Sequence, residues 1–125
     1  MTGLTLDTGA LIALERRDKR TLALVTKARQ QSRAVTVPAP VVVEWWRGQR
    51  GPVARLLAAF DVEPLESELA HVAGAALASA AKGPSPTDAV VMASAARRGD
   101  MVLTSDLEDL GKLQRIFAAV RLLRV

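Results

Sequence analysis

Four acidic residues stand where an apolar, strand-like run of the chain passes into a helix-like segment: Asp7, Glu44, Asp88 and Asp106. If the strands are parallel these acids converge, because the carboxyl ends of parallel strands meet at the sheet edge where open α/β proteins bind ligands. Asp109, three residues after Asp106, is expected at the same place. Mg²⁺ and Mn²⁺ favour carboxylate oxygens as ligands, so the pattern predicts a metal site for phosphodiester chemistry.

Composition narrows the class of protein. The chain has 125 residues, half of them hydrophobic, which predicts one domain (residues 1–125) with a sizeable core. It contains no cysteine, which excludes disulfides and thiolate metal sites. The single histidine, His71, leaves no Ser-His-Asp triad or histidine-rich zinc site of the usual kind. No signal-like N-terminus and no apolar run near 18 residues is present, so we expect a cytoplasmic protein with no membrane association.

The charge distribution suits a polyanionic substrate. The formal net charge is +4, from 17 basic and 13 acidic residues. If five acids share one pocket, eight acids remain against 17 basic residues, an excess of nine positive charges on the other surfaces. A basic exterior around an acidic pocket would attract a polyanion towards a metal, although an arginine-rich background composition explains the same numbers.

Hydrophobic spacing, glycine and proline predict alternating strands and helices. We expect a three-layer α/β/α domain with a mostly parallel central sheet of about five short strands. The segment at residues 62–65 contains a proline and is therefore expected at a sheet edge. The predicted strands are 3–6, 34–37, 62–65, 101–103 and 119–123, and the predicted helices are 8–16, 21–31, 52–60, 66–81, 87–98 and 107–114, with a further helix around Glu44 that begins near Pro40 and is broken by Gly48 and Gly51.

Three of the acids also have purely structural explanations. Asp7 is well placed to cap the helix that begins at the next residue, a contribution of about 1 kcal/mol. Asp88 lies three residues after Ser85, the spacing of a capping box. Ser105 and Glu108 have the same spacing, which would place Asp106 in the first turn of a helix, where the dipole favours an anion.

Glu44 is harder to explain as a structural residue. It follows three valines and precedes two tryptophans, surroundings in which an unpaired carboxylate is costly. An ion pair with Arg47 or Arg50 is the structural alternative. Two carboxylates about 4 Å apart repel by roughly 4 kcal/mol at an effective dielectric of 20. Acids at four strand-to-helix joints together therefore favour a bound cation.

Further polar residues near the acids are candidates for binding substrate. Hydroxyls could hold water or phosphate, arginines could contact phosphates, and tryptophans could stack on a base or fill a protein interface. Each has an ordinary alternative, in backbone capping, a solvated surface or core packing. The hydroxyl candidates are Thr8, Thr104 and Ser105, the tryptophans are Trp45 and Trp46, and the arginines are Arg47 and Arg50 together with Arg16, Arg17, Arg97 and Arg98.

At these residues nearly the whole chain resembles a PIN domain, and specifically a VapC-type toxin of a bacterial type II toxin–antitoxin system. Each motif is short, and their order and spacing carry the resemblance. Gly9 departs from the family, in which a serine is common at this position, and so removes a hydroxyl near the pocket. The matching segments are Leu6-Asp7-Thr8-Gly9-Ala10-Leu11-Ile12-Ala13, Val43-Glu44, Thr87-Asp88-Ala89 and Leu103-Thr104-Ser105-Asp106-Leu107-Glu108-Asp109-Leu110.

The resemblance implies a Mg²⁺- or Mn²⁺-dependent endoribonuclease with one or two ions. Asp7, Glu44, Asp88 and Asp106 would be its acidic quartet, with Asp109 as an additional ligand. It implies cleavage of RNA, with tRNA or rRNA as candidate targets, and inhibition of translation. It also implies a homodimer that a small VapB-like antitoxin holds inactive in a hetero-oligomer, by covering the pocket with its C-terminal segment.

Other classes of protein fit less well. A phosphoacceptor receiver domain would need paired acids after the first strand and a lysine after the last, whereas Asp7 stands alone and the last strand brings Arg121 and Arg124. Gly3 and Gly9 do not form the glycine fingerprint of a dinucleotide enzyme. A non-catalytic PIN-like module that binds RNA or protein is the main alternative, and a nuclease that acts on DNA or the ribosome remains within the favoured class.

Overall fold

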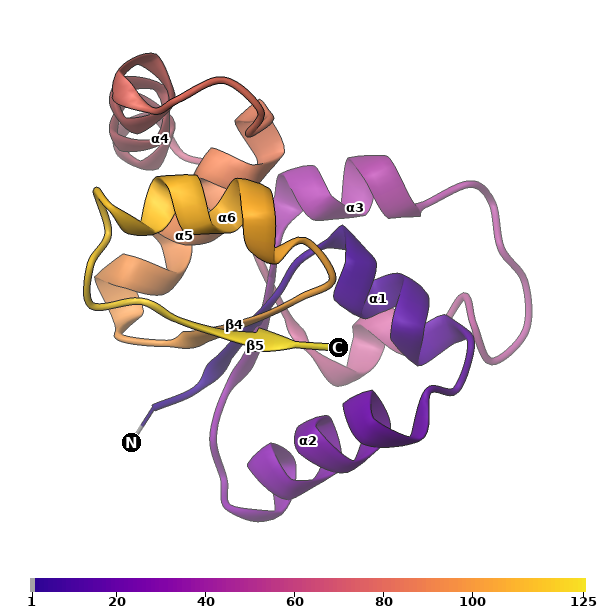
Figure 1. Ribbon diagram of the computed structural model, residues 1–125. Helices are drawn as coiled ribbons and strands as arrows, with labels where there is room; N and C mark the ends of the chain where they lie inside the picture. The colour runs from indigo at the N-terminus through magenta and orange to yellow at the C-terminus, as the bar shows by residue number, and fades with distance from the viewer. Residues whose placement is uncertain (1) are drawn as a thin grey trace.

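Five parallel strands form one sheet in the order β3-β2-β1-β4-β5 (Figure 1). The structure, a computed structural model, describes residues 2–125. The strands are β1 (Leu4–Leu6), β2 (Val35–Pro38), β3 (Asp61–Glu63), β4 (Met101–Thr104) and β5 (Arg121–Arg124). The helices are α1 (Thr8–Glu15), α2 (Lys19–Gln30), α3 (Ala39–Trp45), α4 (Ser67–Ser79), α5 (Pro86–Arg98) and α6 (Leu107–Gln114), with a 3-10 helix, η1 (Leu56–Ala59).

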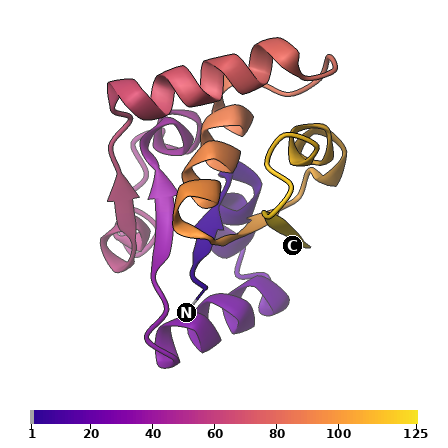
Figure 2. The same ribbon diagram turned by 90° about the vertical axis from the view of Figure 1, so that its left-hand side faces the viewer.

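Helices cover both faces of the sheet, which confirms the three-layer prediction. Helices α1 and α2 pack on one face, whereas α5 and α6 pack on the other (Figure 1). Helix α4 lies across α5 on the outside, as the view turned by 90° shows (Figure 2). None of the helices in residues 2–125 is both long and apolar enough to span a bilayer.

Local signals in the sequence explain where the principal helices begin and end. The Asp7 side chain accepts the N–H of Ala10 and so caps α1. The predicted capping box of Ser85 and Asp88 opens α5. Gly99 ends that helix in the left-handed conformation, at φ +73°, where a glycine carries no steric penalty.

Other boundaries differ from the prediction. The segment 52–60 is not an α-helix: turns lead into the short η1, whose apolar side chains pack against the core only partly, and none of the segment's residues is fully buried. Helix α3 ends at Trp45, before either glycine, because Trp46 is extended. Strand β3 lies at the sheet edge as predicted, but it ends before Pro64, which cannot donate to the ladder.

A polar network joins the sheet to the C-terminal end of α5. Arg98 donates to Asp100 at 3.0 Å and to the Thr5 hydroxyl at 2.8 Å, and it also pairs with Glu63. The Thr5 hydroxyl in turn donates to Asp100 at 2.9 Å. Ser94 donates to the other oxygen of Glu63 at 2.6 Å. Residues from β1, β3 and α5 are therefore held together through one guanidinium group.

Candidate active site

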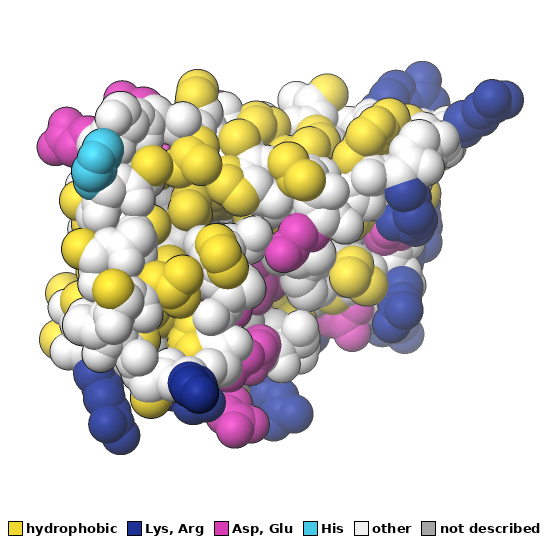
Figure 3. Space-filling model, turned by 90° about the horizontal axis from the view of Figure 1, so that it is seen from above, with side chains coloured by type: hydrophobic (Ala, Val, Ile, Leu, Met, Phe, Trp, Pro, Cys, Tyr) yellow, Lys and Arg dark blue, Asp and Glu magenta, His cyan; other side chains and the backbone are white. Residues whose placement is uncertain are grey.

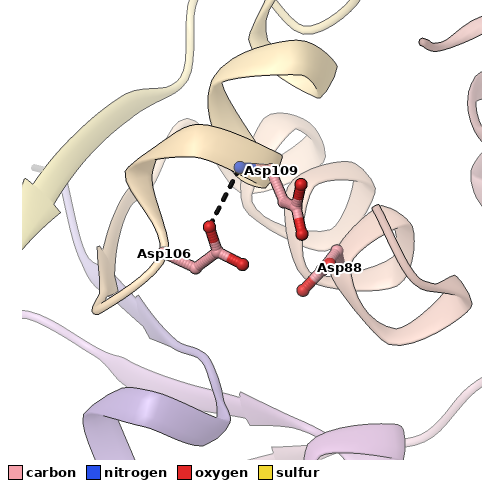
Figure 4. A group of neighbouring side chains, drawn as sticks. All are labelled: Asp88, Asp106 and Asp109. Carbon is pink, nitrogen blue, oxygen red and sulfur yellow. Dashed lines mark hydrogen bonds between the residues drawn. The ribbon is translucent and has the colours of Figure 1, made fainter. Parts of the chain in front are cut away.

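Three carboxylates meet at the carboxyl edge of the sheet. One oxygen from each of Asp88, Asp106 and Asp109 lies within 4.8 Å of the others, and all three side chains are partly buried. Asp88 comes from the first turn of α5, whereas Asp106 and Asp109 come from the start of α6, and the carboxylates face one another across the gap between these helices (Figure 4). This donor set of hard oxygens suits a small divalent cation.

Backbone hydrogen bonds fix the orientation of two of these carboxylates. Asp88 Oδ2 accepts the N–H of Ser85 at 2.9 Å, so its Oδ1 is available to a ligand. Asp106 Oδ1 accepts the N–H of Asp109 at 2.9 Å, and the Asp106 N–H donates to the Thr104 hydroxyl at 2.8 Å. Asp106 is therefore itself the N-cap of α6. The predicted capping box of Ser105 with Glu108 is wrong, because the helix begins one residue later than that box requires.

Asp7 lies deeper, beside the three-carboxylate group, and is only 6% exposed. The pKa of its carboxyl is raised to about 6, chiefly by burial and also by the charges of Asp88 and Asp106, against the opposing effect of hydrogen bonds from Thr104 and Ala10. Burial also raises the pKa of Asp88, with Asp106 and Asp109 adding to the rise and Ser85 opposing it. Both shifts show that negative charge is costly here, and a cation would offset that cost.

Glu44 stands on the open side of the site. It is exposed on α3, and its Oε1 accepts a hydrogen bond from the Thr8 hydroxyl. Together with Val43, Leu65 and Thr87 it lines a hollow of about 490 Å³, and Thr87 immediately precedes Asp88. Glu44 is not one of the three carboxylates that lie within 4.8 Å of one another, and it lines the wall of this hollow.

The alternative explanation of Glu44, an ion pair with Arg47 or Arg50, is not found within residues 2–125. Arg47 instead pairs with Glu15, which also accepts the indole N–H of Trp45 at 3.0 Å. Trp45 is buried, as core packing predicts, whereas Trp46 is 46% exposed. Arg50 is exposed and makes no ion pair in the described part of the chain.

The hydroxyl candidates have different positions. Thr8 holds Glu44, and Ser105 is exposed beside Asp106. Thr104 is fully buried, and its hydroxyl accepts the N–H of Asp106.

Sequence reasoning missed one charged group beside the acids. The Lys112 ammonium lies 3.5 Å from Asp109 Oδ1 and donates to the carbonyl oxygen of Lys82 at 2.7 Å. The helical spacing of three residues between Asp109 and Lys112 was the available signal. Lys112 partly offsets the charge of the group and ties α6 to the loop before α5.

The face that carries the site is divided by charge. Seen from above Figure 1, acidic side chains run across the middle of this face, hydrophobic side chains gather to one side, and lysines and arginines lie towards the margins (Figure 3). The exposed apolar residues include Val43, at 81%, and Leu65, at 44%. An acidic centre is therefore bordered by an apolar surface and by basic groups.

Comparisons with known proteins agree with this architecture. Residues 4–115 match the family model described as the PIN domain. No curated protein matches the sequence. Three solved structures resemble the chain at sequence identities of 18% or less, and this likeness shows the fold alone. These structures are DNA-bound VapBC from Salmonella typhimurium (TM-score 0.72, 18% identity, covering 99% of this chain and 98% of that chain), VapBC2 from Rickettsia felis bound to a promoter DNA fragment (0.74, 8%, 98% and 98%) and FitAB bound to the IR36 DNA fragment (0.67, 18%, 97% and 94%).

Proposed function

The chain belongs to the PIN-domain family, and we propose that it is a metal-dependent endoribonuclease, the toxin of a toxin–antitoxin pair that inhibits translation by cleaving RNA. The observation that carries the proposal is the convergence of Asp88, Asp106 and Asp109 within 4.8 Å, with the buried Asp7 beside them. A group of acids at the edge of a parallel sheet, in which burial raises the pKa of Asp7 and of Asp88, is what a cation-dependent site requires.

The residues present fit one or two Mg²⁺ or Mn²⁺ ions. All the candidate ligands are carboxylates, the donor type that these hard cations prefer, and the chain has no cysteine to favour a softer metal. Asp88, Asp106 and Asp109 would hold the cation, with Asp7 as a further ligand. Such a cation would lower the pKa of the attacking water and would offset the negative charge that builds on the phosphate.

The protein groups then orient the reaction. Glu44, held by the Thr8 hydroxyl on the open side of the site, is placed to position the attacking water and accept its proton. Asp7 remains ionised above about pH 6, the form that a cation needs. Water would attack the phosphorus opposite the 3′-oxygen, so the bond between phosphorus and that oxygen would break and leave a 5′-phosphate and a 3′-hydroxyl.

We propose a small VapB-like antitoxin as the partner of a homodimer of this chain in the cytoplasm. VapBC and FitAB, which resemble this chain in fold, were solved as complexes bound to DNA. The apolar hollow beside Glu44, with Val43 strongly exposed, adjoins the acids and offers a surface that such a partner would cover.

Cleavage of a mixed cellular RNA pool, which contains tRNA and rRNA, tests the proposal. Wild type should make discrete cuts with Mg²⁺ or Mn²⁺ and none with EDTA. Asp7→Asn should not cut, whereas Asp61→Asn, which removes an exposed acid at the opposite edge of the sheet, should cut like wild type. RNA binding without cleavage under every metal condition would favour the non-catalytic module instead.

A further inference from the structure

A second hollow borders the acids on the side away from the apolar one. It encloses about 500 Å³ and lies between α1 and the ends of β4 and β5. Gly9 and Ser105 line it next to the acids, Ile12 and Ala13 provide an apolar wall, and Arg16 stands at its rim. Its volume falls in the range of small-molecule sites, about 300–1,000 Å³, and suits one nucleotide.

Gly9 and Ser105 fit together as a pair. A Cβ atom at Gly9 would lie 2.0 Å from the Ser105 hydroxyl oxygen and 3.0 Å from the Ser105 Cβ. The serine hydroxyl therefore occupies the space that a side chain at position 9 would take. In the chain, Gly9 is two residues after Asp7, and Ser105 directly precedes Asp106.

The rim of the hollow carries one basic residue, Arg16, and one acid, Asp18. Arg16 begins a turn of four basic residues and one acid, Arg16-Arg17-Asp18-Lys19-Arg20. The acid is already engaged: Asp18 Oδ2 accepts the N–H of Thr21 at 2.9 Å and its hydroxyl at 2.7 Å, and so caps α2. Arg16 is exposed and makes no ion pair within residues 2–125, in contrast to Arg47. Its guanidinium is available to an anion.

We propose that this hollow binds the nucleotide next to the scissile phosphate of single-stranded RNA, an inference that rests on the proposed nuclease function. The Ser105 hydroxyl donates to a phosphate oxygen, Arg16 binds the following phosphate, and Ile12 and Ala13 contact the sugar or base. The RNA strand thus extends from the acids past Arg16 and does not occupy the apolar hollow beside Glu44.

The first test measures binding of a fluorescent single-stranded RNA of randomised sequence, with Mg²⁺ in an Asp7→Asn background that does not cut it. Ser105→Ala should weaken binding about tenfold, as expected for a lost hydrogen bond to a charged group. Arg16→Gln should lower the slope of log affinity against log salt by about 0.7, the loss of one phosphate contact. The control is Arg29→Gln, an equal change of charge at the opposite edge of the sheet, which should change neither quantity.

The second test moves the hydroxyl from one partner of the pair to the other. Ser105→Gly should weaken binding like Ser105→Ala, and adding Gly9→Ser should restore it, because the new serine fills the vacated space. Melting temperatures verify that each variant is folded. If Arg16→Gln and Ser105→Ala bind RNA like Arg29→Gln, the subsite is wrong, whereas metal-dependent cleavage by wild type would still support the nuclease. If wild type does not cut RNA but the binding effects of these variants are observed, only the proposed nuclease function is overturned.

Discussion

The Thr8 hydroxyl donates a hydrogen bond to Oε1 of Glu44, which joins the first turn of α1 to the last turn of α3. Thr8 follows the buried Asp7 directly. This hydrogen bond holds the exposed Glu44 at the opening of the site. Its partner Thr8 is the chain neighbour of Asp7, the most deeply buried acid of the site. This contact links residues 36 positions apart in the chain.

Replacing Thr8 by valine should lower the rate of RNA cleavage about fivefold, the loss expected from about 1 kcal/mol of hydrogen bonding at an exposed position. The shape of the side chain is kept, so the melting temperature should stay close to that of wild type. Thr26→Val is the matched control, since Thr26 is exposed on α2. Equal cleavage rates for the two variants would show that Glu44 needs no anchor.

Asp7 should make the metal-free protein less stable as the pH rises. Its folded pKa, about 6, is above the unfolded value of 3.8, so the unfolded state loses its proton first. The penalty is absent below about pH 4, grows between the two pKa values and amounts to about 3 kcal/mol above pH 6. Asn keeps the side-chain oxygen that caps α1 but carries no charge.

Urea unfolding of wild type and Asp7→Asn in EDTA measures this penalty. The variant should gain stability relative to wild type from pH 4 to pH 6.5, with little further change above that. A constant difference across this range would mean that the Asp7 carboxyl has an ordinary pKa in the folded protein.

Added Mg²⁺ or Mn²⁺ should raise the melting temperature of wild type, because a ligand that binds only the folded state stabilises it. The increase should be larger at pH 7.5 than at pH 5.5, since at the lower pH a cation competes with the proton that Asp7 retains, and the raised pKa of Asp88 acts in the same direction. An Asp7→Asn/Asp106→Asn variant should show little increase. An increase as large as that of wild type would place the metal elsewhere.

Arg98→Met should destabilise the fold by about 3 kcal/mol, because it leaves the buried Asp100 without its charged partner and removes one from Glu63. Arg97→Met is the control: its pairs with Glu63 and Glu66 are more exposed, so the denaturation midpoint should hardly move. Equal losses for the two variants would show that the network around Arg98 does not act as a unit.

Local sequence signals predicted most of the fold. Asp7, Ser85 and Gly99 set helix boundaries through bonds and dihedral angles within a few residues, which is why the helices they bound were placed correctly. The segment 52–60 was misjudged because Gly51 and Pro52 suggest a helix start, whereas the deciding factor is how little of the segment the core buries.

The geometry of the site was harder to predict from the sequence, because much of it comes from contacts between residues that are far apart in the chain. The grouping of Asp88 with Asp106 depends on how α5 and α6 pack, although their positions at strand-to-helix joints suggested it. The pairing of Arg47 with Glu15, 32 residues apart, follows no local spacing. The burial of Thr104 likewise depends on the strand pairing on both sides of β4.

The most direct test of the metal-centred site is cleavage of an RNA whose scissile phosphate carries sulfur in place of one non-bridging oxygen, with both diastereomers assayed. Mg²⁺ binds sulfur poorly and Mn²⁺ accepts it better, so a cation that contacts this phosphate reveals itself by the metal dependence of the sulfur effect. We expect one diastereomer to be cut at least about tenfold more slowly than the oxygen substrate in Mg²⁺ and to recover in Mn²⁺. The same slowing in both metals for both diastereomers would contradict a cation held by these carboxylates at the reacting phosphate.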